Sequence, residues 1–177
     1  QGYFETLTSS FTSEKRLSAL NTSLSEELVR LVNPLGEENS IMRNTLIGHQ
    51  LEVISLNYNR KNPSGHFFEI ANTYFASAAP EELPVEEKKL VISTYGNDDY
   101  FELKGMVEIL LTYSGIDNAS FVAGGSDILH PGRKATIYLE DVKLGEIGEV
   151  HPAVVKNYEL PKRCYVCELS FKALYEC

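Results

Sequence analysis

The longest regular pattern of apolar and polar positions lies between Ser40 and Phe75. Apolar residues recur there at helical spacing, and polar or small residues fill the opposite side, which predicts a helix with one buried face. The apolar stripe comprises Ile47, Leu51, Ile54 and Tyr58, widened by Leu46, Val53 and Leu56, and the opposite side comprises Gly48, Glu52, Ser55 and Asn59.

A turn and a strand follow this helix. Residues 62–65 (NPSG) must turn the chain, because proline lacks an amide hydrogen and glycine tolerates positive φ. Residues 67–74 then alternate, with large apolar and small side chains on both sides. This mixture predicts a strand inside a sheet whose faces are covered by helices.

A second long helix is predicted to begin at Asp99. Glu102 stands three residues further on, as in a capping box, and Gly115 ends the segment. The predicted apolar stripe of this helix comprises Leu103, Met106, Val107, Leu110 and Tyr113.

The rest of the chain reads as short strands joined by turns. Residues 140–141 (ED) form a hairpin signal, and strands joined this tightly must be antiparallel. We therefore expect an α+β fold with a mostly antiparallel sheet flanked by helices. The further predicted elements are a β-prone run at 6–11, strands at 28–32, 88–95, 121–122, 134–139, 142–150 and 163–169, a short helix capped by Ser13, another at 152–157, and loops at 22–25 and 76–87.

Size and charge narrow the possible functions. At 177 residues the chain suits a single domain spanning 1–177. Its formal charge of −9 disfavours direct RNA binding, because nucleic-acid affinity depends on Lys and Arg that neutralise phosphates. The sequence has no apolar run near the roughly 20 residues that span a membrane and no signal-peptide pattern at its start, so we expect a cytoplasmic protein.

The three cysteines suggest a reducing compartment. Cys164 and Cys167 spell CxxC, but their odd separation along a predicted strand sends the two side chains to opposite faces. A structural zinc site needs four ligands, and no second CxxC or paired histidine spacing accompanies this one. Buried, unreactive thiols are therefore the favoured interpretation over a metal or redox site.

Several short motifs, in order, resemble the last large domain of the phenylalanyl-tRNA synthetase beta chain. The resemblance implies the catalytic fold of class II aminoacyl-tRNA synthetases in a catalytically silent form, a fragment of a longer beta chain that supports the alpha chain. The likeness extends from residues 2–5 to Leu169, and its motifs are 33–35 (NPL), 42–46 (MRNTL), 57–60 (NYNR), 68–70 (FEI), 99–105 (DYFELKG), 130–133 (HPGR) and 145–152 (GEIGEVHP).

Two positions depart from what a catalytic member of the class would need. Adenylate formation requires cations or metal that offset charge on the ATP phosphates. The resemblance implies an arginine just after Phe75, where this chain has Ala76, and a glycine-rich segment with arginine near the C-terminus, where residues 167–173 contain no glycine. We therefore expect the fold without the reaction, with no catalytic, cofactor-binding or metal-binding residues in this fragment.

Three residues could still have a polar role. Arg43 is the best single candidate, and its structural alternative is a pair with a carboxylate such as Glu69. Arg133 could bind a phosphate, although the HPGR segment reads better as a tight turn that begins a strand. His151 could act as a general base, but no nucleophile stands at a spacing that forces contact, so a satisfied, partly buried histidine is favoured.

Three functions compete. The resemblance implies a scaffold for the alpha chain in an (αβ)₂ tetramer, which joins phenylalanine to its tRNA with ATP and magnesium, tRNA being bound by the holoenzyme. Such a scaffold should expose an apolar patch on the helix at 47–58 or at 103–113. The alternatives are a small nucleotide-using enzyme derived from the class II fold, with Arg43, Arg133 and His151 in one pocket, and a protein-interaction module unrelated to translation.

Overall fold

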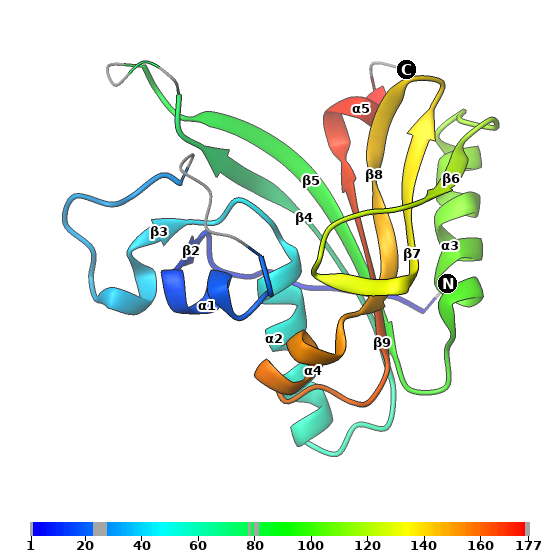
Figure 1. Ribbon diagram of the computed structural model, residues 1–177, viewed down its shortest axis with the longest axis horizontal. Coiled ribbons are helices and arrows are strands. Elements are labelled where there is room, and N and C mark those ends of the chain that lie inside the picture. The colour runs from blue at the N-terminus through cyan, green and yellow to red at the C-terminus, as the bar shows by residue number, and fades with distance from the viewer. Residues whose placement is uncertain (1, 23–27, 78, 80–81, 176–177) are drawn as a thin grey trace.

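Seven strands form one sheet in the order β1-β4-β5-β9-β8-β7-β6. Figure 1 shows its long strands β4, β5, β7, β8 and β9. All neighbours in it are antiparallel except β1 and β4, which run parallel. The computed structural model describes residues 2–22, 28–77, 79 and 82–175. The strands are β1 (Phe4–Glu5), β4 (Gly65–Phe75), β5 (Val85–Tyr95), β6 (Ser120–Ala123), β7 (Leu129–Leu139), β8 (Val142–Val150) and β9 (Cys164–Ser170).

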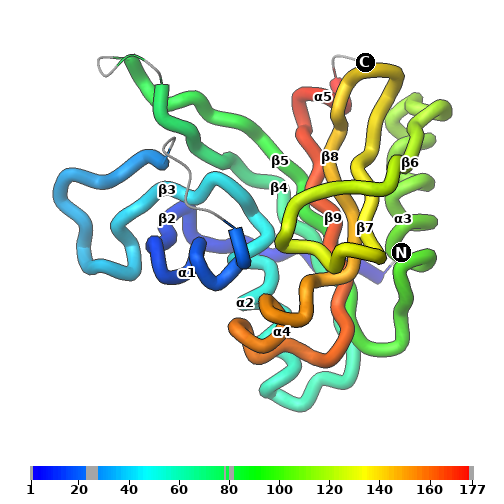
Figure 2. The backbone as a smooth tube through the Cα atoms, in the orientation of Figure 1, coloured from blue at the N-terminus to red at the C-terminus, as the bar shows by residue number. Residues whose placement is uncertain are grey.

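Helices cover both sides of this sheet, and a second sheet of two short strands lies beside it (Figure 2). The predicted α+β fold with a mostly antiparallel sheet is confirmed. The short strands are β2 (Phe11–Thr12) and β3 (Ile41–Met42), and the helices are α1 (Glu14–Ser18), η1 (Glu37–Asn39), α2 (Ile47–Asn59), α3 (Tyr100–Tyr113), α4 (Pro152–Asn157) and α5 (Phe171–Tyr175). Within the described ranges, no helix has the length and apolarity that crossing a membrane requires.

The sheet separates two hydrophobic cores. One contains residues of α2 and α4 and the side chains of Phe67, Val91 and Val166, and we call this side of the sheet the α2 face. The other contains residues of α3 together with Ile147 and Leu169, and we call it the α3 face. Because side chains alternate along a strand, each residue of the central strands belongs to one face or the other.

Local sequence signals account for most element boundaries. Asp99 accepts hydrogen bonds from the first amides of α3 and Glu102 bonds back to its amide, which confirms the capping box. Ser13 caps α1, as predicted. Strand β8 and helix α4 have the predicted bounds, and Glu140, with φ of 51°, forms the turn between β7 and β8.

The strand predicted at 28–32 is wrong. Arg30 forms a single bridge with Ile41, and Val32 is 92% exposed. Two backbone hydrogen bonds flank this bridge, from the Leu31 amide to the Ser40 carbonyl and from the Met42 amide to the Val29 carbonyl. Since β3 is only two residues long, the pairing stops there. Pro34, which has no amide hydrogen, follows closely.

Parts of both predicted helical stripes are wrong. In α3 the buried positions are Leu103, Val107 and Leu111, whereas Tyr113 is 88% exposed. Tyr113 stands two residues beyond Leu111, about 200° around the helix, so it points away from the core. In α2, Leu56 is 51% and Tyr58 44% exposed, although the Tyr58 ring still meets the Tyr95 ring edge to face.

Three further expectations need correction. The loop at 76–87 is shorter, because β5 already begins at Val85 in register with Phe75. The β-prone run at 6–11 forms strands only around its ends, since β1 ends at Glu5 and β2 begins at Phe11. The HPGR motif lies inside β7 at a register shift, and not in a turn before the strand. The loop predicted at 22–25 lies mostly outside the described residues.

Candidate functional site

Arg43 and Glu69 form a buried ion pair on the α2 face. The side chains are 2% and 1% exposed, and Arg43 Nη1 lies 3.2 Å from Glu69 Oε1. Arg43 follows β3, and Glu69 lies in β4 on the same side as Phe67. The structural interpretation of Arg43 that the sequence suggested is therefore confirmed.

Further hydrogen bonds saturate this pair. Arg43 donates from Nε to the carbonyl of Asn72 at 3.1 Å and from Nη1 to the Thr8 hydroxyl at 2.7 Å. Thr8 in turn donates its hydroxyl to Glu69 Oε2 at 2.7 Å and its amide to Oε1 at 3.2 Å. The guanidinium thus ties the segment between β1 and β2 to β4, and its charge is balanced within the fold.

A second, less deeply buried pair lies beside the start of α2. Glu168 of β9 accepts from the Leu46 amide at 2.7 Å and the Thr45 hydroxyl at 2.8 Å. Its other oxygen lies 3.2 Å from Lys89 Nζ. Leu46 provides no side-chain cap of its own, so Glu168 supplies the acceptor and the negative charge that a helix N-terminus favours.

Lys89 has two further contacts. Its ammonium donates to the carbonyl of Asn44 at 3.2 Å and lies 5.3 Å from the centre of the Phe75 ring. The side chain is only 15% exposed. Lys89 is therefore a mostly buried cation that neighbouring groups hold in place.

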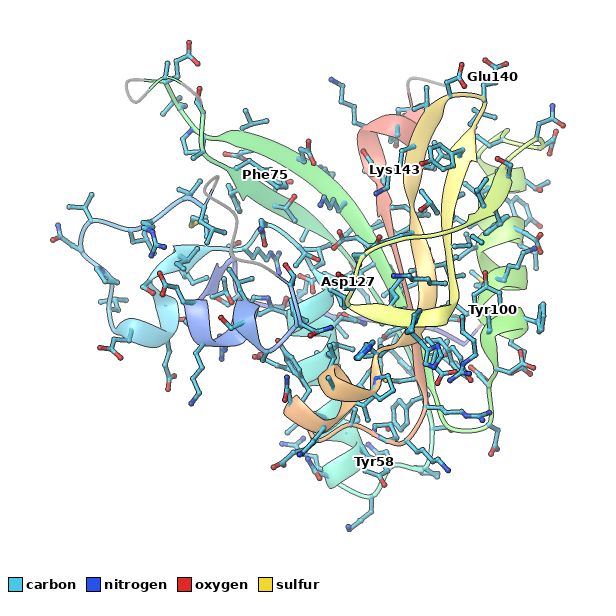
Figure 3. All side chains as sticks on the ribbon, in the orientation of Figure 1. Tyr58, Phe75, Tyr100, Asp127, Glu140 and Lys143 are labelled. Carbon is cyan, nitrogen blue, oxygen red and sulfur yellow. The ribbon has the colours of Figure 1, made fainter. Side chains whose placement is uncertain are left out.

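An open groove of about 330 Å³ lies next to this pair on the same part of the sheet. Three carboxylates and two ammonium groups line it, so its charged groups carry net negative charge. Figure 3 labels Phe75, at the end of β4, and Lys143, at the start of β8, on either side of this part of the sheet. The lining residues are Glu87, Lys89, Ser126, Lys143, Leu144, Gly145, Glu146, Glu168, Leu169 and Ser170.

Contacts within the groove lining bind its acids as well. Glu146 accepts from the Ser126 amide at 2.9 Å and from the Ser126 hydroxyl at 2.6 Å. Gly145 lies so close to β9 that a Cβ atom would stand 2.1 Å from the Glu168 carbonyl oxygen. The groove floor is thus closely packed backbone, and Glu146 and Glu168 are hydrogen-bonded within the chain. Since the charged groups of the lining are net negative, the groove is poorly suited to a polyphosphate.

Neither position at which the resemblance implies an arginine holds one. Ala76 directly follows the last residue of β4, and α5 begins at Phe171 directly after β9. Of the cations near this groove, Arg43 and Lys89 pair with carboxylates of the chain itself, and Lys143 also lines the groove.

Arg133 lies on the other side of the sheet. Its Nε and Nη2 donate to the two oxygens of Glu149 at 2.6 and 2.8 Å, and these bonds raise the pKa of Arg133. Glu149 alternates with Gly148 and shares its side with Ile147, which belongs to the α3 face. The structure therefore does not bring Arg133 together with Arg43.

His151 begins α4. Its Nδ1 accepts from the Ala153 amide at 3.1 Å, which makes it the cap of this helix and confirms the satisfied histidine expected from the sequence. Helix α4 packs on the α2 face through Val154, whereas the Arg133 side chain pairs with Glu149 on the α3 face. His151 and the Arg133 side chain therefore lie on different sides of the sheet. A single pocket formed by Arg43, Arg133 and His151 does not exist in this fold.

The two cysteines of the CxxC motif face opposite sides, as predicted. Cys164 belongs to the core of the α2 face and Cys167 to that of the α3 face. Both are buried, and burial raises the pKa of each thiol well above its ordinary value. Both side chains therefore remain protonated thiols at neutral pH.

Sequence reasoning missed Lys89 and Glu168. The only available signals were a lysine next to the apolar run 90–92 and an acid between Cys167 and Leu169. Their pairing depends on β5 and β9 being neighbours, which no local pattern shows.

A family model described as the phenylalanyl tRNA synthetase beta chain CLM domain matches residues 1–171. The chain is similar to the phenylalanine–tRNA ligase beta subunit of Clostridium acetobutylicum, with 38% identity over 99% of this chain and 23% of the relative. The corresponding subunits of Carboxydothermus hydrogenoformans and Neisseria gonorrhoeae are 35% and 30% identical, again over 23% of their length. The chain thus spans about a quarter of the relatives that it matches.

A solved structure shows the same fold. A pyrrolysyl tRNA synthetase from Desulfitobacterium hafniense superposes with a TM-score of 0.80 over 98% of this chain and 60% of that one. The sequences are only 15% identical, so this likeness concerns the fold, which is that of the class II synthetases.

Proposed function

Since the chain belongs to the family of phenylalanyl tRNA synthetase beta chain CLM domains, we propose that it is a single non-catalytic domain that supports the alpha chain of the ligase. The holoenzyme, a cytoplasmic (αβ)₂ tetramer, attaches phenylalanine to its tRNA with ATP and magnesium. This domain contributes shape and contact surface to that assembly, and little or no tRNA binding of its own.

The observation that carries this proposal is the pairing of cations on the α2 face. A nucleotide triphosphate needs unengaged cationic groups or metal ligands. Here Arg43 pairs with Glu69 and Lys89 with Glu168, and the lining of the neighbouring groove is net negative. Within the described residues, no group of three or more metal-ligating side chains is positioned to hold an ion.

The exposed side of α3 is the favoured contact surface for the alpha chain. Phe101, Ile109 and Tyr113 are 74%, 42% and 88% exposed and follow one ridge of the helix at four-residue multiples. Gly105 completes this ridge, and an added Cβ there would meet nothing within 4 Å, which leaves room for close approach. Large exposed apolar side chains at helical spacing are typical of a protein interface.

Calorimetry tests the absence of a nucleotide site. The isolated domain, titrated with ATP and magnesium and then with phenylalanine, should give no saturable heat. Saturable binding of either ligand would instead support the nucleotide-using enzyme and overturn the proposal.

Capture by the alpha chain tests the scaffold role. The beta chain carrying Ile109→Lys and Tyr113→Lys should lose at least about tenfold in affinity for the alpha chain, because two apolar anchors become charged. The matched control carries Leu56→Lys and Tyr58→Lys on α2, which is similarly exposed, and should bind normally. Equal binding by both variants would exclude the α3 ridge as the contact.

A further inference from the structure

Two glycines lie inside helices of the described chain, and only one of them has a neighbour that requires it. A Cβ atom at Gly48 of α2 would stand 3.3 Å from the Tyr158 hydroxyl and 3.4 Å from the Leu20 side chain, so the missing side chain lets these residues approach. A Cβ atom at Gly105 of α3 would meet nothing within 4 Å. No contact among the described residues therefore explains a glycine at position 105.

The backbone of α3 does not require this glycine either. Gly105 lies well inside the helix, which spans Tyr100–Tyr113, and it is not among the residues with positive φ. Alanine at this position would stabilise the helix, because glycine loses more conformational freedom when it becomes helical. Close approach of another polypeptide is a physical reason to leave the position bare.

Large side chains stand on both sides of Gly105 along the helix. Residues four apart share one side of a helix, so Phe101 and Ile109 flank Gly105, and both are exposed. Their Cα atoms are about 12 Å apart along the helix axis. We call this gap, with Gly105 as its floor and Phe101 and Ile109 as its ends, the Gly105 notch. Figure 1 shows α3 along one margin of the molecule.

Acids flank the Gly105 notch across the helix. Glu102 and Glu108 stand three residues before and after Gly105, one on each side, and both are exposed. Glu108 pairs with Lys104. The Lys104 ammonium also lies 4.4 Å from the centre of the Phe121 ring on β6, so it is held to one side of the notch. The rim that a partner meets therefore presents two carboxylates.

The Gly105 notch suits a large apolar side chain carried by a helix. Packed helices place the side chains of one between the ridges of the other, with axes about 8–10 Å apart, and small residues at the crossing allow the shorter distances. A helix that crosses α3 at Gly105 can insert such a side chain between Phe101 and Ile109. Lysine or arginine beside that side chain would meet the two carboxylates of the rim.

Charge disfavours a second copy of this chain as the occupant. A twofold contact centred on Gly105 would bring Glu102 and Glu108 of one copy against the same acids of the other, and like charges repel at short range. The whole chain also carries a formal charge of −9. A different polypeptide with basic residues fits better, and the proposed function supplies one in the alpha chain.

We propose that a helix of the alpha chain crosses α3 at the Gly105 notch, with a large apolar side chain between Phe101 and Ile109 and with lysine or arginine facing Glu102 and Glu108. This inference rests on the proposed scaffold function, and it names the point and the chemistry of the contact. Gly105 keeps the notch open, and the two glutamates select a basic partner.

Filling the notch tests this contact. The full beta chain is titrated with the purified alpha chain, and Gly105→Ala should weaken binding at least about threefold and Gly105→Leu at least about tenfold, because the new side chain occupies the space of the partner. Alanine favours the helix, so the loss in Gly105→Ala cannot come from unfolding of α3. The matched control is Ala153→Leu, an exposed position of α4 on the α2 face, which should bind normally.

The outcomes separate this inference from the scaffold role. Normal binding by Gly105→Leu would overturn the inference, and the scaffold role would stand if Ile109→Lys with Tyr113→Lys still lost affinity. An equal loss in Ala153→Leu would also overturn it, because the effect would not be specific to the notch. Self-association of the full beta chain that Gly105→Leu abolishes would assign the notch to a second copy instead. Failure of the unmodified beta chain to bind the alpha chain would overturn the scaffold role and the inference together.

Charge reversal tests the basic character of the partner. Glu108→Lys should lower the association rate constant at least about threefold at low salt, and the difference should shrink at high salt, because ions screen the attraction. Glu38→Lys in η1 makes the same change of charge at an exposed position and should leave the rate constant nearly unchanged. Equal rate constants for the two variants, with circular dichroism showing both folded, would contradict a lysine or arginine at this rim.

Discussion

The two faces of the sheet differ in how much of their surface the described chain closes. The α2 face buries charged and polar groups, among them Arg43, Glu69 and Gln50, and closes each on a neighbour. The α3 face is apolar from α3 to β4 and leaves part of that surface open. The first face is thus closed internal structure, whereas the second leaves an apolar groove open beside α3, over β4 and β5.

The largest effect is expected at the buried pair of the α2 face. Arg43→Met should lower the free energy of unfolding by about 3–5 kcal/mol, because it leaves the Glu69 carboxylate buried and unpaired. Urea or guanidinium denaturation measures this change. Ile70→Thr, one residue after Glu69 but on the other face, should change the free energy by less than about 0.5 kcal/mol, since Ile70 is 39% exposed.

A double variant separates charge from packing at the same place. Arg43→Met combined with Glu69→Leu should recover most of the lost stability, because no unpaired charge remains. A double variant as unstable as Arg43→Met alone would show that the hydrogen bonds to Thr8 and Asn72, and not the ion pair, fix this region.

The next effect concerns the floor of the groove on the α2 face. Gly145→Ala should cost about 1–3 kcal/mol, because its Cβ would stand 2.1 Å from the Glu168 carbonyl and β8 must move away from β9. Gly132→Ala is the matched control, since the nearest atom there is 3.7 Å away on the His130 side chain. Thermal unfolding compares the two. A tolerated Gly145→Ala would show that β8 and β9 can separate here without loss of stability.

The sequence predicted elements and pairs that depend on local patterns. Helix α2, strand β8 and the Asp99 cap follow from spacing within a few residues, and the resemblance of the segment around Arg43 drew attention to that residue, with Glu69 as a candidate partner. The contact of Glu168 with Leu46 joins residues 122 positions apart, and only the strand order creates it. The uncovered groove beside α3 likewise depends on which strands α3 covers, so no periodicity could predict it.

A smaller effect is expected on the α3 face, at the start of its helix. Asp99→Ala removes the side chain that accepts from the Phe101 and Glu102 amides and should cost about 1 kcal/mol. Denaturant midpoints measure the change, and Ser114→Ala at the other end of α3 serves as the comparison. A loss above about 3 kcal/mol would mean that the α3 face depends on this cap as strongly as the α2 face depends on its ion pair.

The smallest effect concerns His49, which lies on α2 and donates from Nε2 to the Phe11 carbonyl at 2.9 Å. Burial lowers its pKa below the ordinary 6.5, and Arg43 and Arg16 act in the same direction, while the bond to Phe11 and the charge of Glu52 oppose it. The unfolded chain therefore binds the proton more readily than the folded one. Stability from this group is fully present above pH 6.5 and declines as the pH falls below that value.

His49→Gln should make the free energy of unfolding depend less on pH in this range. Denaturation of both proteins between pH 5.5 and about 7.5 isolates the contribution, because His66, His130 and His151 are common to them. The wild type should lose stability towards pH 5.5 relative to the variant. If the free energies of unfolding of the two proteins changed in parallel with pH, protonation of His49 would cost no stability. Water would then reach the His49 side chain on the α2 face.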